Sequence, residues 1–167
     1  MTSQAGKTEQ GGFVFAELLV VIAIIAAVLA LAAPALRGTW NETNFNAAVR
    51  EFSARLSDAR MQSVSREKKA RISIDLRRNR YLLEIEQDNG EFSAPKSSLD
   101  KPRSLPKDTH FLSVEGPDIL PAASDAYVVF SPDGTATERK IIIKDKNGKA
   151  FEIKVHPATG SVSTKSI

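Results

Sequence analysis

The side chain with the most telling chemistry is Glu17, a single carboxylate inside an apolar segment. It follows Phe13 by four residues, and every residue from 18 to 33 is apolar. At the centre of a membrane helix a carboxylate costs roughly 2.5–3.5 kcal/mol on insertion scales, because hydrocarbon does not solvate its charge. We therefore predict a function for Glu17, namely pairing with a positive charge in apolar surroundings.

The remaining side chains offer no catalytic or metal-binding set. The two histidines, His110 and His156, have no Ser/Asp partners or metal ligands at suitable spacing. The chain has no cysteine, which excludes thiolate nucleophiles, disulfides and cysteine-based metal sites. Asp145 to Gly148 begin like a calcium loop but lack the acidic ligands that should follow. We therefore expect a protein that is not an enzyme and that needs no cofactor or metal.

Seven basic residues cluster between residues 66 and 80. Only two acids, Glu67 and Asp75, share this stretch, which leaves an excess of five positive charges. Such a patch can bind phosphate groups, but it can equally be a solvated hairpin surface or contact acidic neighbours. The net charge of the whole chain is only +3 and does not by itself indicate nucleic acid. The seven residues are Arg66, Lys68, Lys69, Arg71, Arg77, Arg78 and Arg80.

The element that carries Glu17 is predicted to be a membrane helix. Residues 13–33 are 21 in number, which corresponds to about 31 Å of helix, and a hydrocarbon core is about 30 Å thick. The alternative is a secretory signal peptide with its apolar core at residues 18–29 and a small-residue cleavage site at residues 30–32. The thin basic region, with Lys7 alone, and the position of Glu17 argue against that alternative.

Beyond Pro34 and Gly38 an amphipathic helix pattern resumes, with Asn41 or Thr43 as the expected cap of a restarted helix. Apolar residues then recur at steps of four, three, four and three, which predicts one buried stripe. We expect this helix to pack on a β-sheet. The stripe consists of Phe45, Val49, Phe52, Leu56 and Ala59.

From Ala70 the apolar period changes to two, which indicates strands. A hairpin is predicted at residues 70–86 with its turn at residues 77–79, followed by a loop at residues 93–108. Further strands are expected at residues 110–115, 127–130, 137–144, 150–155 and 161–164, separated by Gly and Pro turns. The fold class predicted is therefore α+β, a long amino-terminal helix on an antiparallel sheet head.

The amino-terminal pattern resembles a known family. Gly12 and Phe13, followed by Glu17 and a long aliphatic run, are similar to the class III leader of type IV pilins and pseudopilins. The resemblance implies that a prepilin peptidase cleaves after Gly12 and methylates the new amino terminus at Phe13. It also implies a helix kink at Pro34. Under this hypothesis residues 1–12 are the leader, residues 13–36 the transmembrane and filament-core helix, and residues 37–167 the periplasmic head.

Cleavage after Gly12 would give Glu17 its partner. The new amine on Phe13 lies one helical turn from the carboxylate, and in an apolar bundle it can pair with the carboxylate of an adjacent subunit. Opposite charges attract strongly in such surroundings, whereas a lone charge is costly. The pair would favour assembly and set the axial register. The alternative is that the Glu17 side chain reaches the membrane interface and has no specific partner.

Later motifs are similar to one group within that family, the GspH/FimT minor pseudopilins and minor pilins. These are the Ala59–Arg60 pair, residues 130–134 (Phe-Ser-Pro-Asp-Gly) and residues 158–162 (Ala-Thr-Gly-Ser-Val). The resemblance implies a minor pseudopilin of a type II secretion system that helps to initiate the periplasmic pseudopilus. The implied partners are prepilin peptidase, other major and minor pseudopilins and the inner-membrane assembly platform. The alternative is a FimT-like minor pilin in pilus assembly or DNA uptake, and we favour secretion over nucleic-acid binding.

Overall fold

The computed structural model of the protein describes residues 9–95, 101–117 and 125–167, and within the first range it describes the side chains of residues 14–30 and 42–95. The chain divides into two compact units, Met1–Thr43 and Asn44–Ile167. We call the second unit the head. Each unit is described by itself.

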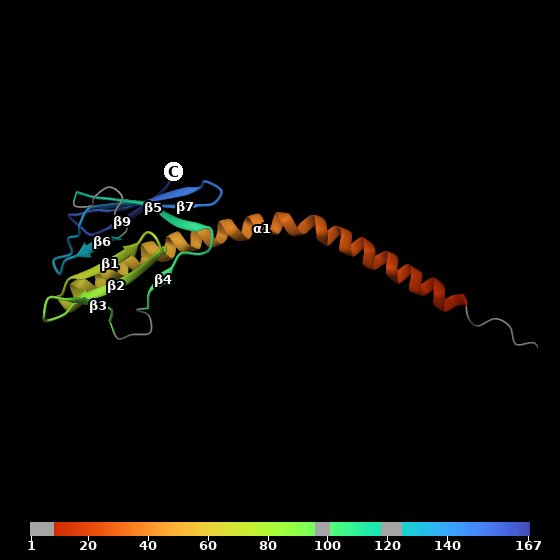
Figure 1. Ribbon diagram of the computed structural model, residues 1–167, viewed down its shortest axis with the longest axis horizontal. Helices are drawn as coiled ribbons and strands as arrows, with labels where there is room; N and C mark the ends of the chain where they lie inside the picture. The colour runs from red at the N-terminus through yellow and green to blue at the C-terminus, as the bar shows by residue number, and fades with distance from the viewer. Residues whose placement is uncertain (1–8, 96–100, 118–124) are drawn as a thin grey trace, which may run out of the picture. The chain divides into compact units, whose positions relative to one another are not determined.

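One helix, α1 (Glu9–Arg66), runs through the described part of both units (Figure 1). The predicted restart near Asn41 or Thr43 is wrong, because Pro34 and Gly38 both lie inside the helix. A proline removes the hydrogen bond of its own N–H and crowds one carbonyl, while the turns on either side keep their bonds. The flanking helical residues therefore suffice to continue α1. The kink at Pro34 stays a prediction, since the surroundings of this side chain lie outside the described residues.

The first sheet of the head has five strands in the order β3-β2-β1-β6, with β4 also paired to β2. All of these pairings are antiparallel. The predicted hairpin at residues 70–86 forms β1 and β2 and is confirmed. The strands are β1 (Ala70–Asp75), β2 (Arg80–Glu86), β3 (Phe92–Ser93), β4 (Arg103–Ser104) and β6 (Asp125–Phe130).

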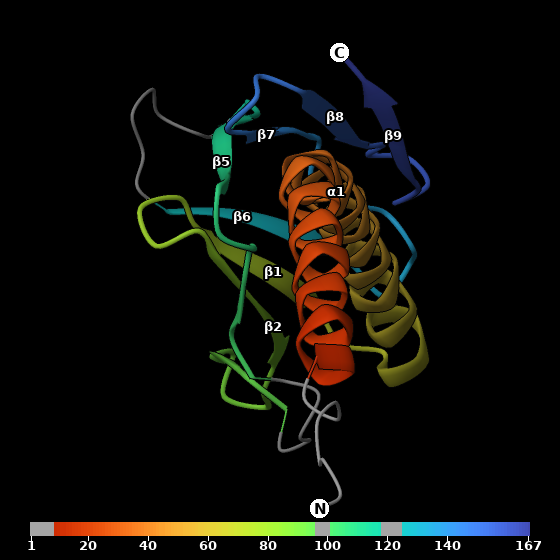
Figure 2. The same ribbon diagram turned by 90° about the vertical axis from the view of Figure 1, so that its right-hand side faces the viewer.

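The second sheet has four antiparallel strands in the order β5-β7-β8-β9. The two sheets cover adjacent sides of the carboxy-terminal part of α1: in Figure 2 the first sheet lies beside the helix and the second lies above it. The predicted α+β fold, a helix on antiparallel β-structure, is thus confirmed, with two sheets in the described head. The strands are β5 (Thr109–Glu115), β7 (Arg139–Asp145), β8 (Ala150–Val155) and β9 (Val162–Ser166).

The predicted helix stripe is the centre of the core. All five of its residues are at most 2% exposed, and they pack against the inward faces of both sheets. The ring of Phe52 makes edge contacts to Tyr81 of the first sheet at 4.9 Å and to Phe111 of the second at 5.2 Å. Such aromatic pairs add about 0.5–1.5 kcal/mol beyond their area burial. Phe52 therefore connects three elements at one point.

Asn79 makes a second connection between the sheets. It lies in the β1–β2 turn with φ at 51°, a conformation that asparagine tolerates better than most residues. Its carbonyl accepts a hydrogen bond from the N–H of Leu105 at 2.9 Å. Its Oδ1 accepts one from the N–H of Phe111, in β5, at 3.0 Å. The turn is thereby held to the edge of the second sheet.

The stretch at residues 93–108 was predicted to be a loop, and this prediction is partly wrong. It contains the end of β3 and all of β4, and Leu105 is only 8% exposed. Two-residue strands have no readable alternation, so the sequence pattern gave no sign of them. An ion pair between Arg103 and Glu51 further attaches β4 to α1. Residues 96–100 lie outside the described part.

The two edge strands of the second sheet are both irregular or polar. The register of β5 against β7 shifts between Phe111 and Ser113, which is a β-bulge. The residue at the bulge, Leu112, is 53% exposed. At the other edge, β9 is short and mostly exposed, and it carries Lys165.

Tyr81 gives the core a testable pH dependence. Burial, followed by the nearby carboxylate of Glu51, raises the pKa of Tyr81 from 10.0 to about 12. Because the folded state holds this proton more tightly, the stabilisation is fully present below pH 10.0 and is lost as pH rises toward 12. Two pKa units correspond to about 2–3 kcal/mol. We expect urea denaturation of the head to show this loss between about pH 10 and about pH 12.

The matched control is Tyr81→Phe, which keeps the ring and removes the titrating hydroxyl. Its free energy of unfolding should fall by about 2 kcal/mol less than that of the wild type over the same pH interval. Equal slopes for the two proteins would contradict the burial of the phenol.

Candidate functional site

The apolar segment of α1 has no packing partner among the described residues. Between residues 14 and 30 every large apolar side chain is exposed, from 49% at Val21 to 63% at Val14, Phe15 and Leu29. A helix that is apolar on all sides must be covered by lipid or by protein. The exposed side chain of Glu17 belongs to this segment. Its carboxylate therefore lies in the same surroundings, lipid or protein, as the apolar side chains beside it.

The other residues of the predicted leader site are described only in part. Gly12 and Phe13 belong to the backbone of α1, but their side-chain surroundings lie outside the described residues. In the part of the chain that the structure describes, no helix combines the length and apolarity of a membrane span. Cleavage after Gly12, methylation of Phe13 and the role of Glu17 therefore stay predictions.

The structure does not bring the seven predicted basic residues together. Arg66, Lys68 and Lys69 lie where α1 ends and β1 begins, whereas Arg77 and Arg78 lie in the turn beyond β1. The six residues of β1 separate the two groups, which corresponds to roughly 20 Å.

Much of this positive charge is also neutralised. Lys68 pairs with Asp88 at 2.6 Å, Lys69 with Glu86 at 4.0 Å and Arg78 with Asp75 at 3.5 Å. The Lys68 ammonium, by its hydrogen bond, lowers the pKa of Asp88. Within the described part of the chain, no ion pair is made by Arg66, Arg77 or Arg80. The seven predicted residues therefore do not form a single continuous phosphate-binding patch.

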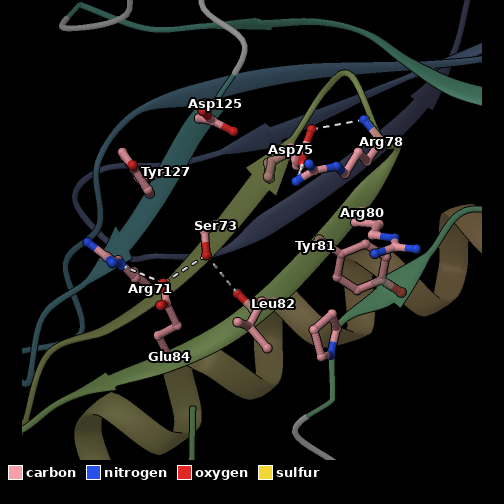
Figure 3. Close-up of a pocket in the computed structure, with 12 residues that line it drawn as sticks. Arg71, Ser73, Asp75, Arg78, Arg80, Tyr81, Leu82, Glu84, Asp125 and Tyr127 are labelled. Carbon is pink, nitrogen blue, oxygen red and sulfur yellow. Dashed lines mark hydrogen bonds and ion pairs between the residues drawn. The ribbon is translucent and has the colours of Figure 1, made fainter. Parts of the chain in front are cut away.

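A groove of about 380 Å³ lies on the outer face of the first sheet (Figure 3). Its floor comes from β1 and β2, and Tyr127 and Asp125 of β6 form one side. Three arginines and three acids line it, so it carries no net charge. The lining residues are Arg71, Ser73, Ile74, Asp75, Arg78, Arg80, Tyr81, Leu82, Glu84, Pro102, Asp125 and Tyr127.

Arg71 is the organising residue of this groove. Its guanidinium carbon lies 4.3 Å from the ring centroid of Phe92 and 4.8 Å from that of Tyr127. Its Nε donates a hydrogen bond to Oε2 of Glu84 at 2.7 Å, and the hydroxyl of Ser73 donates to the same oxygen at 2.7 Å. The cluster joins β3, β2, β1 and β6 on their solvent side. It is a charge-neutral lateral brace made of one ion pair, one hydroxyl and two aromatic rings.

Sequence reasoning placed Arg71 in a basic patch and missed its aromatic partners. The alternation of β1 puts Arg71 and Ser73 on the outward face, but only the pairing of β6 with β1 brings Tyr127 beside them. That pairing links residues 50 to 60 positions apart, and no local signal in the sequence specifies it.

Two further polar residues considered in the sequence, His156 and Asp145, have structural partners. Nε2 of His156 lies 3.2 Å from the hydroxyl of Ser163, and among the described residues no group of three or more His, Cys, Asp or Glu could hold a metal ion. Oδ1 of Asp145 accepts hydrogen bonds from the backbone N–H groups of Asn147 and Lys149. This carboxylate therefore closes the β7–β8 turn, as the hairpin interpretation predicts.

Solved structures with the same fold are bacterial minor pilins and pseudopilins. The minor pseudopilin EpsH from the type 2 secretion system of Vibrio cholerae superposes with a TM-score of 0.60 at 11% identity, covering 74% of this chain and 97% of that one. The type IV minor pilin FimU of Pseudomonas aeruginosa superposes with a TM-score of 0.54 at 18% identity, covering 77% and 96%. The chain has the pilin-like fold.

Another structure of EpsH, a crystal structure, gives a TM-score of 0.58 at 13% identity. No protein-family model matches the chain, and no curated protein matches it significantly. At these identities the likeness shows the fold and does not distinguish a pseudopilin from a pilin.

The brace around Arg71 predicts an energetic coupling between residues on different strands. A cation–π contact of a partly exposed arginine contributes about 0.5–1 kcal/mol. In a double-mutant cycle with Arg71→Met and Tyr127→Leu, we expect a coupling of that size in the free energy of unfolding of the head. The matched control is the cycle of Arg77→Met with Tyr127→Leu, which should give no coupling because Arg77 makes no ring contact among the described residues. Equal couplings in the two cycles would contradict the brace.

Proposed function

We propose that this protein is a minor pseudopilin subunit of a type II secretion system that helps to initiate and assemble the short periplasmic pseudopilus. The pilin-like fold of the head is the observation that carries the proposal. It supports a role as a structural, non-catalytic subunit that assembles with others of its kind. The leader-like pattern of Gly12, Phe13 and Glu17 adds independent support from the other end of the chain.

The proposal assigns two environments to the apolar part of α1. Before assembly, residues 13–33 cross the inner membrane once, with the head in the periplasm. After assembly, the same residues pack among the helices of neighbouring subunits. The support is the uninterrupted apolar run and the exposure of the large side chains in residues 14–30 on all sides. Both environments remove that apolar surface from water, which is worth about 25 cal/mol per Å².

In this scheme prepilin peptidase removes residues 1–12 and methylates Phe13, and the new amine pairs with Glu17 of an adjacent subunit. The head contributes surfaces to other major and minor pseudopilins, and the inner-membrane assembly platform lifts the subunit into the filament.

The second candidate is a FimT-like minor pilin of a type IV pilus that takes up DNA. The fold is equally compatible with it, since FimU shares the fold as well. The basic residues favour the secretion role, because β1 divides them into two groups and four of the seven pair with acids.

Processing of the leader is the most direct test. We expect the intact mass of the protein from bacterial membranes to correspond to a chain that begins at a methylated Phe13. Gly12→Leu should block the peptidase and leave the leader attached. Gly11→Leu is the matched control, since it changes the neighbouring glycine. A mature chain beginning at Ala33 would instead indicate a signal peptide and reject the proposal.

The role of Glu17 is tested by assembly. Glu17→Gln keeps the shape of the side chain and removes its charge, so the variant should still insert into the membrane. Its incorporation into filaments, measured by cross-linking to other pseudopilins, should fall about tenfold or more, because breaking a buried ion pair costs about 3–5 kcal/mol. Glu152→Gln in the head should assemble normally. Normal assembly of Glu17→Gln would mean that the charge of this carboxylate has no role in assembly.

A further inference from the structure

Charge is distributed unevenly along the head. The chain enters the head at Asn44, and we call the end around this residue the entry end. It gathers seven cations, which we call the basic collar. Four acids lie among them, Asp75, Asp108, Asp125 and Asp145, which leaves an excess of three positive charges. The collar consists of Arg77, Arg78, Arg80, Lys107, Lys144, Lys146 and Lys149.

A chain of contacts places the collar at this end. Phe45, the first buried residue of the head, packs on Phe151 with 5.5 Å between ring centroids. Nζ of Lys149 lies 5.6 Å from the centroid of the same Phe151 ring. The neighbouring Lys146 bonds Asp108 through its backbone N–H at 3.0 Å and through its Nζ at 2.8 Å.

The arginines of the β1–β2 turn join the same end through Asn79, which lies directly between Arg78 and Arg80. Its hydrogen bonds to Leu105 and Phe111 hold the turn beside the segment that carries Lys107. Arg77, Arg80 and Lys107 are exposed and make no ion pair within the described part of the chain, so their charges are available to a partner.

The opposite end of the head has no such excess. There α1 ends against the β6–β7 turn, where the hydroxyl of Ser63 donates to the carbonyl of Ser131 at 3.2 Å. Seven cations and seven acids of the described chain lie at this end, where β5 ends, β7 begins and β8 ends, so it carries no net charge. They are Arg60, Arg66, Lys68, Lys69, Arg139, Lys140 and Lys154, with Glu67, Glu86, Asp88, Glu91, Glu115, Asp133 and Glu138.

We propose that the basic collar binds an anionic phospholipid surface, so that the head rests on the membrane beside its own anchor before assembly. The inference rests on the proposed function. Only residues 34–44 separate the proposed span from the head, and eleven residues can extend over at most about 40 Å. The entry end of the head is therefore tethered close to the bilayer. Clustered Lys and Arg that come within the screening length of about 8 Å at physiological salt are attracted to anionic lipids.

The test uses the head fragment, residues 39–167. All buried core residues lie between Phe45 and Val155, so the fragment keeps the whole hydrophobic core. Co-sedimentation is measured with vesicles of phosphatidylglycerol and phosphatidylcholine and with vesicles of phosphatidylcholine alone, at about 50 mM and about 300 mM salt. We expect binding only to the anionic vesicles, weakened at the higher salt.

The variant that tests the collar is the triple substitution Arg77→Gln, Arg80→Gln and Lys107→Gln, which breaks no ion pair of the described structure. It should weaken binding by about tenfold or more. The matched control, Arg66→Gln, Lys68→Gln and Lys69→Gln, removes the same charge from the opposite end and should bind as the wild type does. Equal weakening by both variants would overturn the proposal, because it would indicate attraction by net charge alone.

Duplex DNA at the same salt concentrations is the competing partner. Weaker binding to DNA than to anionic vesicles supports the proposal, and tighter binding to DNA overturns it in favour of nucleic-acid recognition. The vesicle assay needs neither the leader nor a filament. Its failure would leave the processing of Gly12 and the proposed function standing, whereas failure of processing would not alter the lipid affinity of the head.

Discussion

The head depends on one constraint, the burial of a single helix stripe against two sheets at once. Phe52 lies where the helix and both sheets meet, and its ring contacts Tyr81 of the first sheet and Phe111 of the second, whose rings also contact each other. Residues on either side of it along the stripe are buried to a similar degree. Neither sheet could cover its apolar face without this helix, so the helix fixes how both sheets pack. The outer faces are left to polar clusters such as the brace around Arg71.

The apolar surface of the same helix differs between its two parts. Between residues 45 and 59 its apolar side chains form one stripe that the head covers. Between residues 14 and 30 they surround the helix and nothing described covers them. A stripe specifies one partner geometry, because only one rotation of the helix buries it. An all-round apolar surface accepts lipid or any neighbouring helix, which suits a segment proposed to exchange a membrane for a filament.

The spacing of apolar residues and the turn residues predicted the parts of this fold that depend on neighbouring residues in the sequence. The stripe from Phe45 to Ala59, the β1–β2 hairpin and the β7–β8 hairpin all follow from periodicity and turn residues. The division of the strands into two sheets, the pairing of β6 with β1 and the brace at Arg71 depend on contacts between residues far apart in the sequence, for which a single chain gives no signal. Asn79 is intermediate: its turn was predicted, but the hydrogen bonds that tie it to the second sheet were not. For the candidate site, the sequence predicted roles for Glu17 and for the basic residues. In the structure the basic residues lie at two different ends of the head.

The bulge in β5 and the polar character of β9 affect how heads interact at high local concentration. A straight exposed strand offers its unpaired backbone groups to any other strand, and proteins kept at high local concentration polymerise through such edges. Here the register shift beside Leu112 distorts one border of the second sheet, and Lys165 charges the other. Heads at high local concentration would therefore resist pairing edge to edge into cross-β aggregates.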